Sequence, residues 1–299
     1  MKPDSLFKKV LITGINGFTG IHLEKHLQEK GFDVYGTVID TPQTSRHFQC
    51  DITQKEQVEQ VMASVKPDYI IHIAAISFAA EENASLIYDV NVIGTENILR
   101  SLMNSHLKPK KIILASSAAV YGNQGREILD ESMCPQPVNH YGCSKLSMEY
   151  MAANYFDTLN IIITRPFNYT GIGQEKHFLI PKIVHHFKHG EKEIELGNIH
   201  VAREFNDIDY VIEIYHKLLL SDAKSTIVNI SSEKPVKLLD VIETMQKIAG
   251  YTINIKINPA FVRTNEIKSL AGSTAKLATL MTLPKTISLE KTLKEMYEN

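Results

Sequence analysis

A tyrosine and a lysine lie four residues apart in the segment YGCSK, at positions 141 and 145. At the start of a helix this spacing places Tyr141 and Lys145 on one face. A free phenol titrates near pH ~10, so proton exchange near neutrality needs about 4 kcal/mol of differential interaction. A neighbouring ammonium, helped by an oxidised nicotinamide, can favour the phenolate in this way. The pair therefore predicts proton exchange with an alcohol or carbonyl while hydride moves to or from a nicotinamide.

A second tyrosine competes for the same role. Tyr121 lies in the segment SSAAVYG, residues 116–122, at the end of a strongly apolar run. Gly125 stands where the lysine partner of Tyr121 would have to be, so Tyr141 is the better candidate. Because YxxxK also occurs by chance as a surface pair, the proposed chemistry needs a cofactor site elsewhere in the chain.

A glycine loop, GINGFTG at residues 14–20, supplies a candidate for that site. Its spacing is GxxGxxG rather than GxGxxG, and it joins the first predicted strand to the first predicted helix. Glycines here allow a tight turn and a close approach of a pyrophosphate to backbone N–H groups. Asp40 ends the second predicted strand about twenty residues later, as a dinucleotide-binding site requires.

The acidic residues after the glycine loop bear on which dinucleotide binds. Asp40 is expected to accept hydrogen bonds from the adenosine ribose and to repel a 2′-phosphate, which favours NADH. Arg46 is close enough in sequence to leave NADPH open. Asp51 is a candidate for the adenine edge, or alternatively the N-cap of a helix over residues 52–65.

The elements that must position these residues alternate between short β-branched runs and longer amphipathic segments. Continuous Ile/Val runs separated by helices indicate a parallel sheet covered on both faces. We therefore predict an α/β fold, a doubly wound parallel sheet (Rossmann-like) with a smaller interleaved C-terminal lobe. The predicted strands are 8–14, 33–40, 68–74, 110–117, 160–166 and 226–230, and the helices are 18–30, 54–65, one long helix within 84–105, 141–158, 178–189 and 208–220.

Two interleaved units follow from this pattern. Residues 1–170, with about 203–232, are predicted to form the dinucleotide-binding domain. Residues 171–202 and 233–299 are predicted to form the smaller substrate-binding lobe, whose tail from 235 mixes short helices and one strand.

The overall composition excludes several classes of function. A formal net charge of −2 over 299 residues provides no electrostatic surface for nucleic acid or an anionic membrane. The longest apolar stretch, residues 69–80, is too short to span a membrane. Cys50, Cys134 and Cys143 form neither a metal-binding spacing nor an even disulfide set. We expect a soluble cytoplasmic protein.

No metal site is predicted. The segment HLEKH, from His22 to His26, has its glutamate third rather than second and so fails the metalloprotease pattern HExxH. We expect its histidines to be solvated, and His185, His186 and His189 to mark a polar helix face.

In combination, these segments resemble the extended short-chain dehydrogenase/reductase family, which acts on nucleotide sugars. GxxGxxG, HIAA (72–75), NVIGT (91–95), SSAAVYG, YGCSK and RPFN (165–168) occur in the order and approximate spacing of that family. The resemblance implies that Ser117 hydrogen-bonds the reacting oxygen, that Tyr141 exchanges its proton, and that Lys145 holds the nicotinamide ribose. The expected cofactor-binding residues are Gly14, Asn16, Gly17, Phe18, Gly20, Asp40, Asp51, Ile52, Ala74, Ala75, Asn91, Tyr141 and Lys145.

The second half of the chain resembles one subgroup. RPFNYTGIGQ (165–174), GNIHVAREFNDI (197–208) and INPAFVRTNEI (257–267) are similar to GDP-4-keto-6-deoxy-mannose reductases and the related GDP-mannose dehydratases. By that match Arg203 and Arg263 clamp a diphosphate, Glu266 binds the nucleoside ribose, and Asn168 lines the substrate pocket. The sequence RTNE departs from the expected Pro and Ser between the arginine and the glutamate.

Ala118 and Ala119 discriminate between reactions. Dehydratases that resemble this chain carry acidic residues one or two positions after the catalytic Ser/Thr, whereas a methyl group cannot carry a proton. The prediction is therefore a reductase of a GDP-linked 4-keto-6-deoxy hexose or heptose that uses NAD(P)H, with NADH favoured by Asp40. A nucleotide-sugar 4-epimerase with tightly bound NAD, or a catalytically silent NAD(P)-binding regulatory protein, are the alternatives. The family also implies a homodimer that packs helices near 84–105 and 141–158.

Overall fold

The computed structural model describes residues 8–77, 83–262 and 269–299 of the chain. Its centre is a seven-stranded sheet in the order β12-β7-β5-β4-β1-β2-β3, in which every neighbouring pair is parallel. All six strands predicted from the sequence belong to it, and β3 is an additional short strand. The strands are β1 (Lys9–Thr13), β2 (Asp33–Val38), β3 (His47–Gln49), β4 (Tyr69–His72), β5 (Lys111–Ala115), β7 (Ile161–Pro166) and β12 (Thr226–Ile230).

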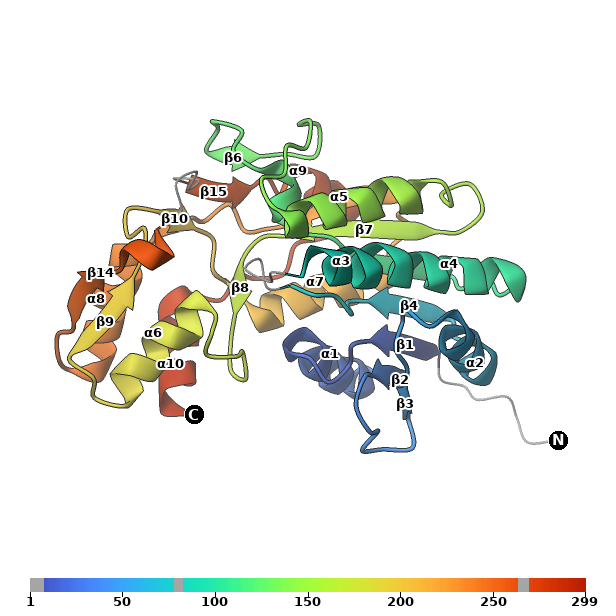
Figure 1. Cartoon of the computed structure of the whole chain (residues 1–299), viewed down its shortest axis with the longest axis horizontal. Coiled ribbons are helices and arrows are strands. Elements are labelled where there is room, and N and C mark those ends of the chain that lie inside the picture. The colour runs from blue at the N-terminus through green and yellow to red at the C-terminus, as the bar shows by residue number, and fades with distance from the viewer. Residues whose placement is uncertain (1–7, 78–82, 263–268) are drawn as a thin grey trace.

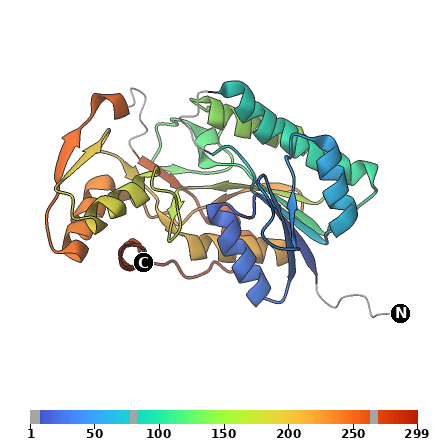
Figure 2. The ribbon, with the colours of Figure 1, turned by 60° about the horizontal axis from the view of Figure 1, so that its bottom comes forward.

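Helices cover both faces of this sheet, as the continuous apolar strands require. α2 (Lys55–Val65), α4 (Gly94–Asn104) and α5 (His140–Ala153) share one hydrophobic core with the sheet. α1 (Phe18–Glu29), α7 (Ile208–Leu220) and the short α9 (Ala275–Leu280) pack on the opposite face. Figure 2 shows the sheet between the two helix layers. The doubly wound α/β prediction is confirmed.

Two predicted helices differ from the observed ones. The single helix expected within 84–105 is divided into α3 (Ala84–Tyr88), a π-helical turn (Asp89–Ile93) and α4. The helix expected over 141–158 ends at Ala153, where Tyr155 and Phe156 donate backbone hydrogen bonds three residues back, to Ala152 and Ala153. These tighter bonds end the helix and turn the chain toward the buried Leu159 that precedes β7.

The second lobe lies beside the sheet and contains its own hydrophobic core (Figure 1). α6 (Leu179–Lys188), α8 (Leu238–Ala249) and α10 (Leu289–Glu298) pack there against β9 (Glu193–Leu196), which pairs with β14 (Asn254–Ile257). Between the lobes run a four-stranded sheet and a two-stranded one. The first comprises β13 (Val236–Lys237), β10 (Ala202–Arg203), β15 (Ser269–Gly272) and β6 (Ile128–Leu129), and the second comprises β8 (Tyr169–Thr170) and β11 (Asn206–Asp207).

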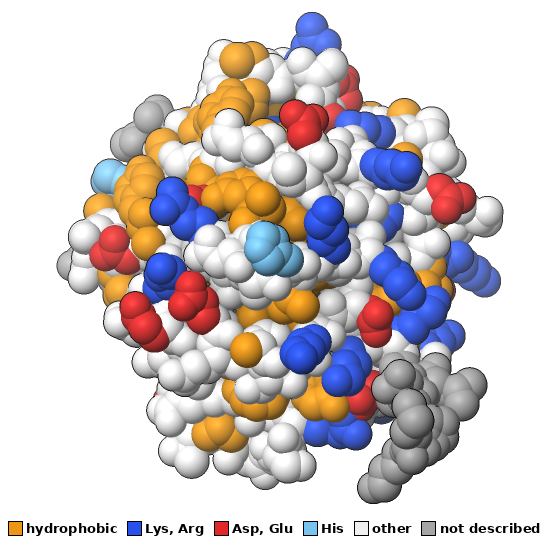
Figure 3. All heavy atoms as spheres, turned by 90° about the vertical axis from the view of Figure 1, so that its right-hand side faces the viewer, with side chains coloured by type: hydrophobic (Ala, Val, Ile, Leu, Met, Phe, Trp, Pro, Cys, Tyr) orange, Lys and Arg blue, Asp and Glu red, His pale blue; other side chains and the backbone are white. Residues whose placement is uncertain are grey.

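The C-terminal tail departs from its prediction in two respects. It holds three strands, β13, β14 and β15, rather than one, because each finds its partner in a distant segment rather than in a local hairpin. In addition, α9 does not lie with the second lobe: Leu277 is fully buried in the same core as α1 and α7. No helix among the described residues is long and apolar enough to cross a bilayer. The face shown in Figure 3 mixes acidic, basic and scattered hydrophobic side chains.

The strand order determines where a ligand can bind. From β1 the chain proceeds outward to β2 and β3, and then returns to β4 on the other side of β1. In open α/β sheets this reversal leaves a crevice at the carboxyl ends of the two central strands. The glycine loop follows β1 and Ala74 follows β4, so both predicted cofactor segments lie at this point.

Candidate active site

A cavity of about 1240 Å³ opens at this crevice and extends between the two lobes. The sheet lobe contributes the glycine loop and the ends of β2, β4 and β5, while the second lobe contributes residues 174–180 and β10. Most of the predicted site residues line it. These are Gly14, Asn16, Gly17, Phe18, Gly20, Asp51, Ile52, Ala74, Ala75, Ser117, Tyr141, Lys145, Asn168 and Arg203.

The glycine loop has the close packing that a dinucleotide cradle needs. Gly14 has φ +71°, and a Cβ there would lie 3.0 Å from the Ala74 Cα. A Cβ on Gly20 would lie 2.4 Å from the Ile15 carbonyl oxygen. Gly17 is the N-cap of α1 and has no side chain to satisfy the first N–H groups of that helix. The loop therefore leaves helix N–H groups directed at an anion, as a pyrophosphate site requires.

The acidic and basic residues near the adenosine end lie in different places. Asp51 lines the cavity, and its Oδ1 accepts hydrogen bonds from the Thr53 N–H and hydroxyl at 2.9 and 2.8 Å. The N-cap of α2 is Gln54 and not Asp51. Asp40 is exposed just after β2 and is not among the residues that line the cavity, although Val38 and Ile39 are.

Arg46 is engaged at the opposite end of β2. Its guanidinium is ion-paired with Asp33, the first residue of that strand, and lies over the Tyr35 ring with Cζ 5.0 Å from the ring centroid. The cavity lies at the carboxyl end of the sheet, so these two contacts hold Arg46 away from it.

Ser117 and Tyr141 are brought together although 24 positions separate them in the sequence. Tyr141 is in the first turn of α5, and Ser117 caps a short 3₁₀ helix (Ala118–Tyr121) by accepting a hydrogen bond from the Ala119 N–H at 3.1 Å. Burial raises the pKa of the Tyr141 phenol to about 12, and a side-chain hydrogen bond with Ser117 acts in the opposite direction. Near neutral pH Tyr141 is therefore a protonated hydrogen-bond donor.

Lys145 lies one helical turn after Tyr141 and is almost completely buried. Its Nζ donates a 2.8 Å hydrogen bond to the Ala115 carbonyl at the end of β5. Burial lowers its pKa to about 8, while the Glu149 carboxylate acts in the opposite direction. The ammonium is thus fixed at the cavity wall with a proton that it can lose at moderately alkaline pH.

A buried ion pair between Glu149 and Arg165, which was not predicted from the sequence, lies behind Ser117, Tyr141 and Lys145, the predicted catalytic triad. Glu149 Oε1 accepts hydrogen bonds from the Ser116 hydroxyl and from Arg165 Nε at 2.9 Å, and its Oε2 accepts one from Arg165 Nη2 at 2.6 Å. Both charged side chains are at most 4% exposed. The ion pair joins α5 to β7, and the Ser116 hydrogen bond joins Glu149 to the segment after β5. These contacts lie next to two predicted catalytic residues, because Ser116 precedes Ser117 and Glu149 follows Lys145 by one turn. In the sequence, the feature that could have indicated this pair is Glu149, which follows Lys145 of YGCSK by one helical turn.

A second buried network positions the loop after β4. Thr13 donates to His72 Nδ1 at 2.6 Å and accepts from the Ala74 N–H at 3.2 Å. On the other side of the ring, His72 Nε2 lies 2.8 Å from the Thr95 hydroxyl, which donates to the Asn91 carbonyl. This donor order is satisfied by one neutral tautomer of His72, with the proton on Nε2. Burial, assisted by the Lys145 charge, lowers the pKa of His72 to about 3 and keeps it neutral.

Asn91 completes that network rather than lining the cavity. Its Oδ1 accepts from the Ile76 N–H at 2.9 Å, and its Nδ2 donates to the Ile76 carbonyl and to Ser144 Oγ. The side chain is 2% exposed, so its amide ties the cofactor loop to α5. The π-helical turn is what directs Asn91 toward this loop.

The two alanines of SSAAVYG lie at the cavity beside the predicted catalytic serine. Ala118 and Ala119 both line the cavity next to Ser117. Among the described residues, the carboxylates that line it are Asp51, where the adenosine is predicted, and Glu175, on the loop before α6.

The substrate side of the cavity is assembled from distant segments. Arg203 extends from β10, with Nη1 donating to the Ala202 carbonyl at 2.7 Å. The next residue, Glu204, is fully buried and accepts hydrogen bonds from Ser231, Gly272, Asn206 and Ser232. This carboxylate holds β10 in place and was not predicted as a site residue. Arg263 and Glu266 lie outside the described residues.

Tyr169 links the two walls and was also missed. Its hydroxyl lies 2.8 Å from Thr19 Oγ1, and its ring stacks on Phe18 with centroids 6.0 Å apart. The RPFN segment thereby contacts the first turn of α1, where the pyrophosphate is expected. In the sequence, the feature that could have indicated this contact is the position of Tyr169 and Thr170 directly after RPFN.

Comparisons with known proteins place the chain among nucleotide-sugar enzymes. The family model described as GDP-mannose 4,6 dehydratase matches residues 11–296. A GDP-6-deoxy-D-talose 4-dehydrogenase of Aggregatibacter actinomycetemcomitans is 34% identical over 97% of both chains. A GDP-6-deoxy-D-mannose reductase of Pseudomonas aeruginosa is 27% identical over 90% of both chains.

Solved structures agree with the fold. A Burkholderia cenocepacia J2315 protein provisionally described as an epimerase is 39% identical, with a TM-score of 0.91 over 97% of both chains. The RMD protein of Pseudomonas aeruginosa, solved with NADPH, is 24% identical, with a TM-score of 0.85 over 98% of this chain and 97% of that one.

Proposed function

The chain belongs to the GDP-mannose 4,6 dehydratase family, and from that premise we propose that it is an NAD(P)H-dependent reductase of a GDP-linked 4-keto-6-deoxy sugar. The relatives of this chain are NAD(P)-dependent oxidoreductases and epimerases of nucleotide sugars. They support both the proposed oxidoreductase chemistry and the proposed NAD(P)H cofactor. The observation that carries the proposal is an intact Ser117–Tyr141–Lys145 set beside two alanine methyl groups.

The residues present fit the cofactor. The Gly14–Ala74 contact and the bare N-terminus of α1 form a cradle for a pyrophosphate, and Lys145 is placed to hold the nicotinamide ribose. Bound NAD(P)H supplies the hydride that reduces C4 of the sugar. Asp40 does not line the cavity, so the proposed preference for NADH is supported instead by Arg46, whose guanidinium is held by Asp33 away from the cavity.

Tyr141 is the proton donor in the proposed reaction. Its raised pKa keeps the phenol protonated at neutral pH, which is the state that a reductase needs at the start of each turnover. As C4 is reduced, the phenol gives its proton to the developing oxygen and Ser117 donates a hydrogen bond to the same oxygen. The nearby Lys145 ammonium then favours the phenolate until solvent returns a proton. Ketone, hydride and one proton give one alcohol.

Dehydration is not proposed despite the family name. Elimination of water across C5–C6 needs an additional acid/base beside the triad. The positions that carry it in dehydratases resembling this chain hold Ala118 and Ala119, and both residues line the cavity. The site therefore supports hydride and proton transfer at a single carbon.

A spectrophotometric screen tests the proposal. Purified protein is mixed with NADH or NADPH and with 4-keto-6-deoxy sugars on GDP, dTDP, CDP and UDP. We expect net oxidation of cofactor with the GDP-linked substrate and a higher kcat/KM with NADH. The two GDP-sugar relatives are named for 6-deoxy sugars that differ in configuration at C4, talose and mannose. We infer the talo product from the more similar relative, and NMR of the product checks it.

A 4-epimerase is the second candidate, because the 39% identical Burkholderia protein is provisionally described as an epimerase. An epimerase keeps its NAD and catalyses no net oxidation of added NADH. Protein that purifies with stoichiometric NAD and interconverts a nucleotide sugar and its C4 epimer would support it. A silent cofactor-binding protein would bind NAD(P)H and turn over no keto sugar; the complete Ser–Tyr–Lys set argues against it.

We also infer a homodimer in the cytoplasm. Leu86, Ile93, Met103 and Tyr150 are exposed hydrophobic side chains on α3, α4, α5 and the π-helical turn, which lie side by side in Figure 1. Pairing these helices across a two-fold axis would cover them. Tyr150→Glu is expected to give monomers in light-scattering chromatography, whereas Ile257→Glu in the second lobe is expected to leave the dimer intact. All three cysteines are unpaired, as suits a reducing compartment.

A further inference from the structure

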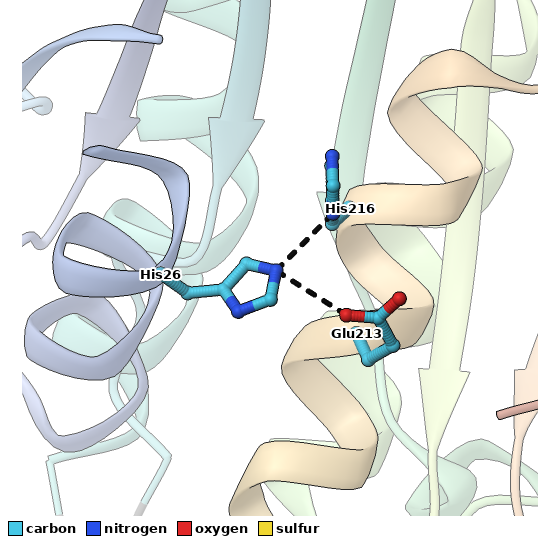
Figure 4. A group of neighbouring side chains, drawn as sticks. All are labelled: His26, Glu213 and His216. Atoms are coloured by element: carbon cyan, nitrogen blue, oxygen red, sulfur yellow. Dashed lines mark hydrogen bonds and ion pairs between the residues drawn. The ribbon is translucent and has the colours of Figure 1, made fainter. Parts of the chain in front are cut away.

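Two histidines and a glutamate meet on the side of the sheet away from the catalytic groups (Figure 4). His26 extends from the last turn of α1, and Glu213 and His216 extend from α7. Glu213 and His216 are three residues apart, so they share a face of that helix. His22, the sequence neighbour of His26, takes no part, because its Nε2 lies 2.9 Å from the Ile172 carbonyl.

The ligand atoms of the three residues are already close together. His26 Nε2 lies 3.1 Å from His216 Nδ1 and 3.4 Å from Glu213 Oε2, and the three ligand atoms lie within 4.8 Å of one another. In a tetrahedral zinc site with metal–nitrogen bonds of about 2.0–2.1 Å, neighbouring ligand atoms are about 3.3 Å apart. The separations of 3.1 Å and 3.4 Å from His26 Nε2 lie just below and just above that value.

The surroundings maintain the form of histidine that binds metal. Burial is the main cause that lowers the pKa values of both His26 and His216, while the Glu213 carboxylate acts in the opposite direction. The lowered pKa values keep both rings neutral at physiological pH. Phe32 packs its ring edge-on against His216, with centroids 5.8 Å apart, and restricts its rotation. The side chains of His26 and Glu213 are 21% and 31% exposed, which leaves an approach for an ion from solvent.

From this geometry we propose that His26, Glu213 and His216 form a binding site for a divalent transition-metal ion of the zinc class. Two imidazoles and one carboxylate are ligands that suit Zn²⁺, and a three-ligand set leaves a position for water. The ion bridges α1, which begins at the glycine loop, and α7, which begins beside β11. None of the three residues lines the active-site cavity, so the proposed role is to fasten two helices and is independent of the reductase assignment.

The test uses full-length, tag-free protein that has been treated with a chelator and dialysed. Zn²⁺ is titrated in competition with a chromophoric chelator, and thermal unfolding is followed with and without Zn²⁺. We expect one Zn²⁺ per chain, with a Kd in the micromolar range or below, and a higher Tm at saturating Zn²⁺. Single variants His26→Ala, Glu213→Gln and His216→Ala should each weaken binding at least 10-fold and remove the Tm shift.

The chain offers a matched control on α6. His185 and His189 stack with ring centroids 4.0 Å apart, yet they are not part of any three-ligand group among the described residues. His185→Ala should leave Zn²⁺ binding unchanged. Circular dichroism checks the fold of each variant, and His216→Asn, which retains a hydrogen-bonding side chain, replaces any variant that fails it.

Replacement of Zn²⁺ by Co²⁺ identifies the ligands independently. A visible spectrum of nitrogen/oxygen-ligated Co²⁺ that disappears in His216→Ala supports the site. A thiolate-to-cobalt charge-transfer band would instead assign the binding to a cysteine. That result, the absence of stoichiometric binding, or binding that survives in both histidine variants would overturn the proposal.

Discussion

The two walls of the active-site cavity are built in different ways. The wall from the sheet lobe carries Ser117, Tyr141 and Lys145, and it is fastened from behind by charged and polar groups that are almost completely buried. The other wall carries Arg203 and Asn168 on short strands and loops between the lobes, and these strands pair with segments that are distant in the chain. Glu204 alone connects three segments there: its own, residues 231–232 and Gly272.

This difference separates chemistry from recognition. The groups that transfer a proton need fixed positions and controlled pKa values, and α5 with β5 provides both within about thirty residues of chain. The groups that bind the nucleotide sugar need only complementary charge at the correct distance. They can change through short segments without disturbing the triad, which is how one fold can serve several nucleotide sugars.

Replacing the proton donor should give the largest effect. Tyr141→Phe removes the phenolic proton, and kcat should fall by roughly 10²–10⁴-fold, the range for loss of a general acid. Cofactor affinity, measured by fluorescence titration, should stay within a factor of two or so of the wild type, since the phenol is one contact among many. Tyr121→Phe is the matched control: its hydroxyl donates to Asn229 and the residue does not line the cavity, so activity should be retained. Equal activity in the two variants would remove the distinction between the tyrosines.

Breaking the buried ion pair should cost the most stability. Glu149→Gln leaves Arg165 charged and buried, and Nη1 of that guanidinium already lacks a hydrogen-bond partner. The free energy of unfolding in urea should fall by about 3–5 kcal/mol. Glu243→Gln breaks an exposed pair with Lys247 on α8 and should show no measurable change. A similar, small loss in both variants would contradict the view that the triad's wall is fastened from behind.

Altering the recognition wall should affect binding rather than chemistry. Arg203→Met removes a guanidinium expected to contact the diphosphate, and KM for the nucleotide sugar should rise about 10–100-fold, from the loss of about 1.5–3 kcal/mol of charged hydrogen bonding. The kcat at saturating substrate and the Kd of NADH should be nearly unchanged. Initial-rate kinetics with each substrate varied in turn provide the measurement, and a fall confined to kcat would place Arg203 in the chemical step instead.

A smaller effect, the pH dependence of kcat/KM, tests the wall that carries Ser117, Tyr141 and Lys145. Lys145 is charged below its pKa of about 8, and burial is what brings the value down from 10.5. Its ammonium is lost as the pH rises through 8, whereas Tyr141, with a pKa of about 12, stays protonated. In the reducing direction kcat/KM should therefore fall above about pH 8. Lys145→Arg keeps the charge, so any residual activity should show this fall at higher pH.

Stability should respond to pH in the opposite sense. Because the folded-state pKa of Lys145 is depressed, the folded chain binds fewer protons than the unfolded chain between about pH 8 and 10.5. The contribution of Lys145 to the free energy of unfolding rises with pH across this window. Urea titrations of the wild type and Lys145→Met at pH 8 and pH 10 isolate that contribution.

Sequence patterns predicted the sheet lobe because its signals are local. Ile/Val runs form the strands, and the glycine loop, YGCSK and SSAAVYG each lie within one turn or one helix. The structure places most of the residues they designate around one cavity. Local patterns did not predict the positions of two residues correctly. Asp40 lies outside the cavity lining, and the side-chain amide of Asn91 is hydrogen-bonded to Ile76 and Ser144.

Features created by distant partners were beyond the reach of the sequence. β13, β14 and β15 pair with segments far away in the chain, and α9 returns to the sheet lobe. Glu204 acquires its role only when three segments converge, and the Glu149–Arg165 pair acquires its role only when α5 packs on β7. The cluster of His26 with Glu213 and His216 joins positions nearly 190 residues apart, whereas a metal-binding spacing in the sequence relates only neighbouring residues.

The central claim is that this site delivers a hydride and a proton to one carbon with net consumption of cofactor. The direct measurement incubates the enzyme with GDP-4-keto-6-deoxy-D-mannose and NADH carrying deuterium at nicotinamide C4, and then examines the product by NMR. We predict one deuterium at C4 of a GDP-6-deoxyhexose, one NADH oxidised per product, and no product with Tyr141→Phe. Product without deuterium at C4, or interconversion of C4 epimers without loss of NADH, would contradict the assignment.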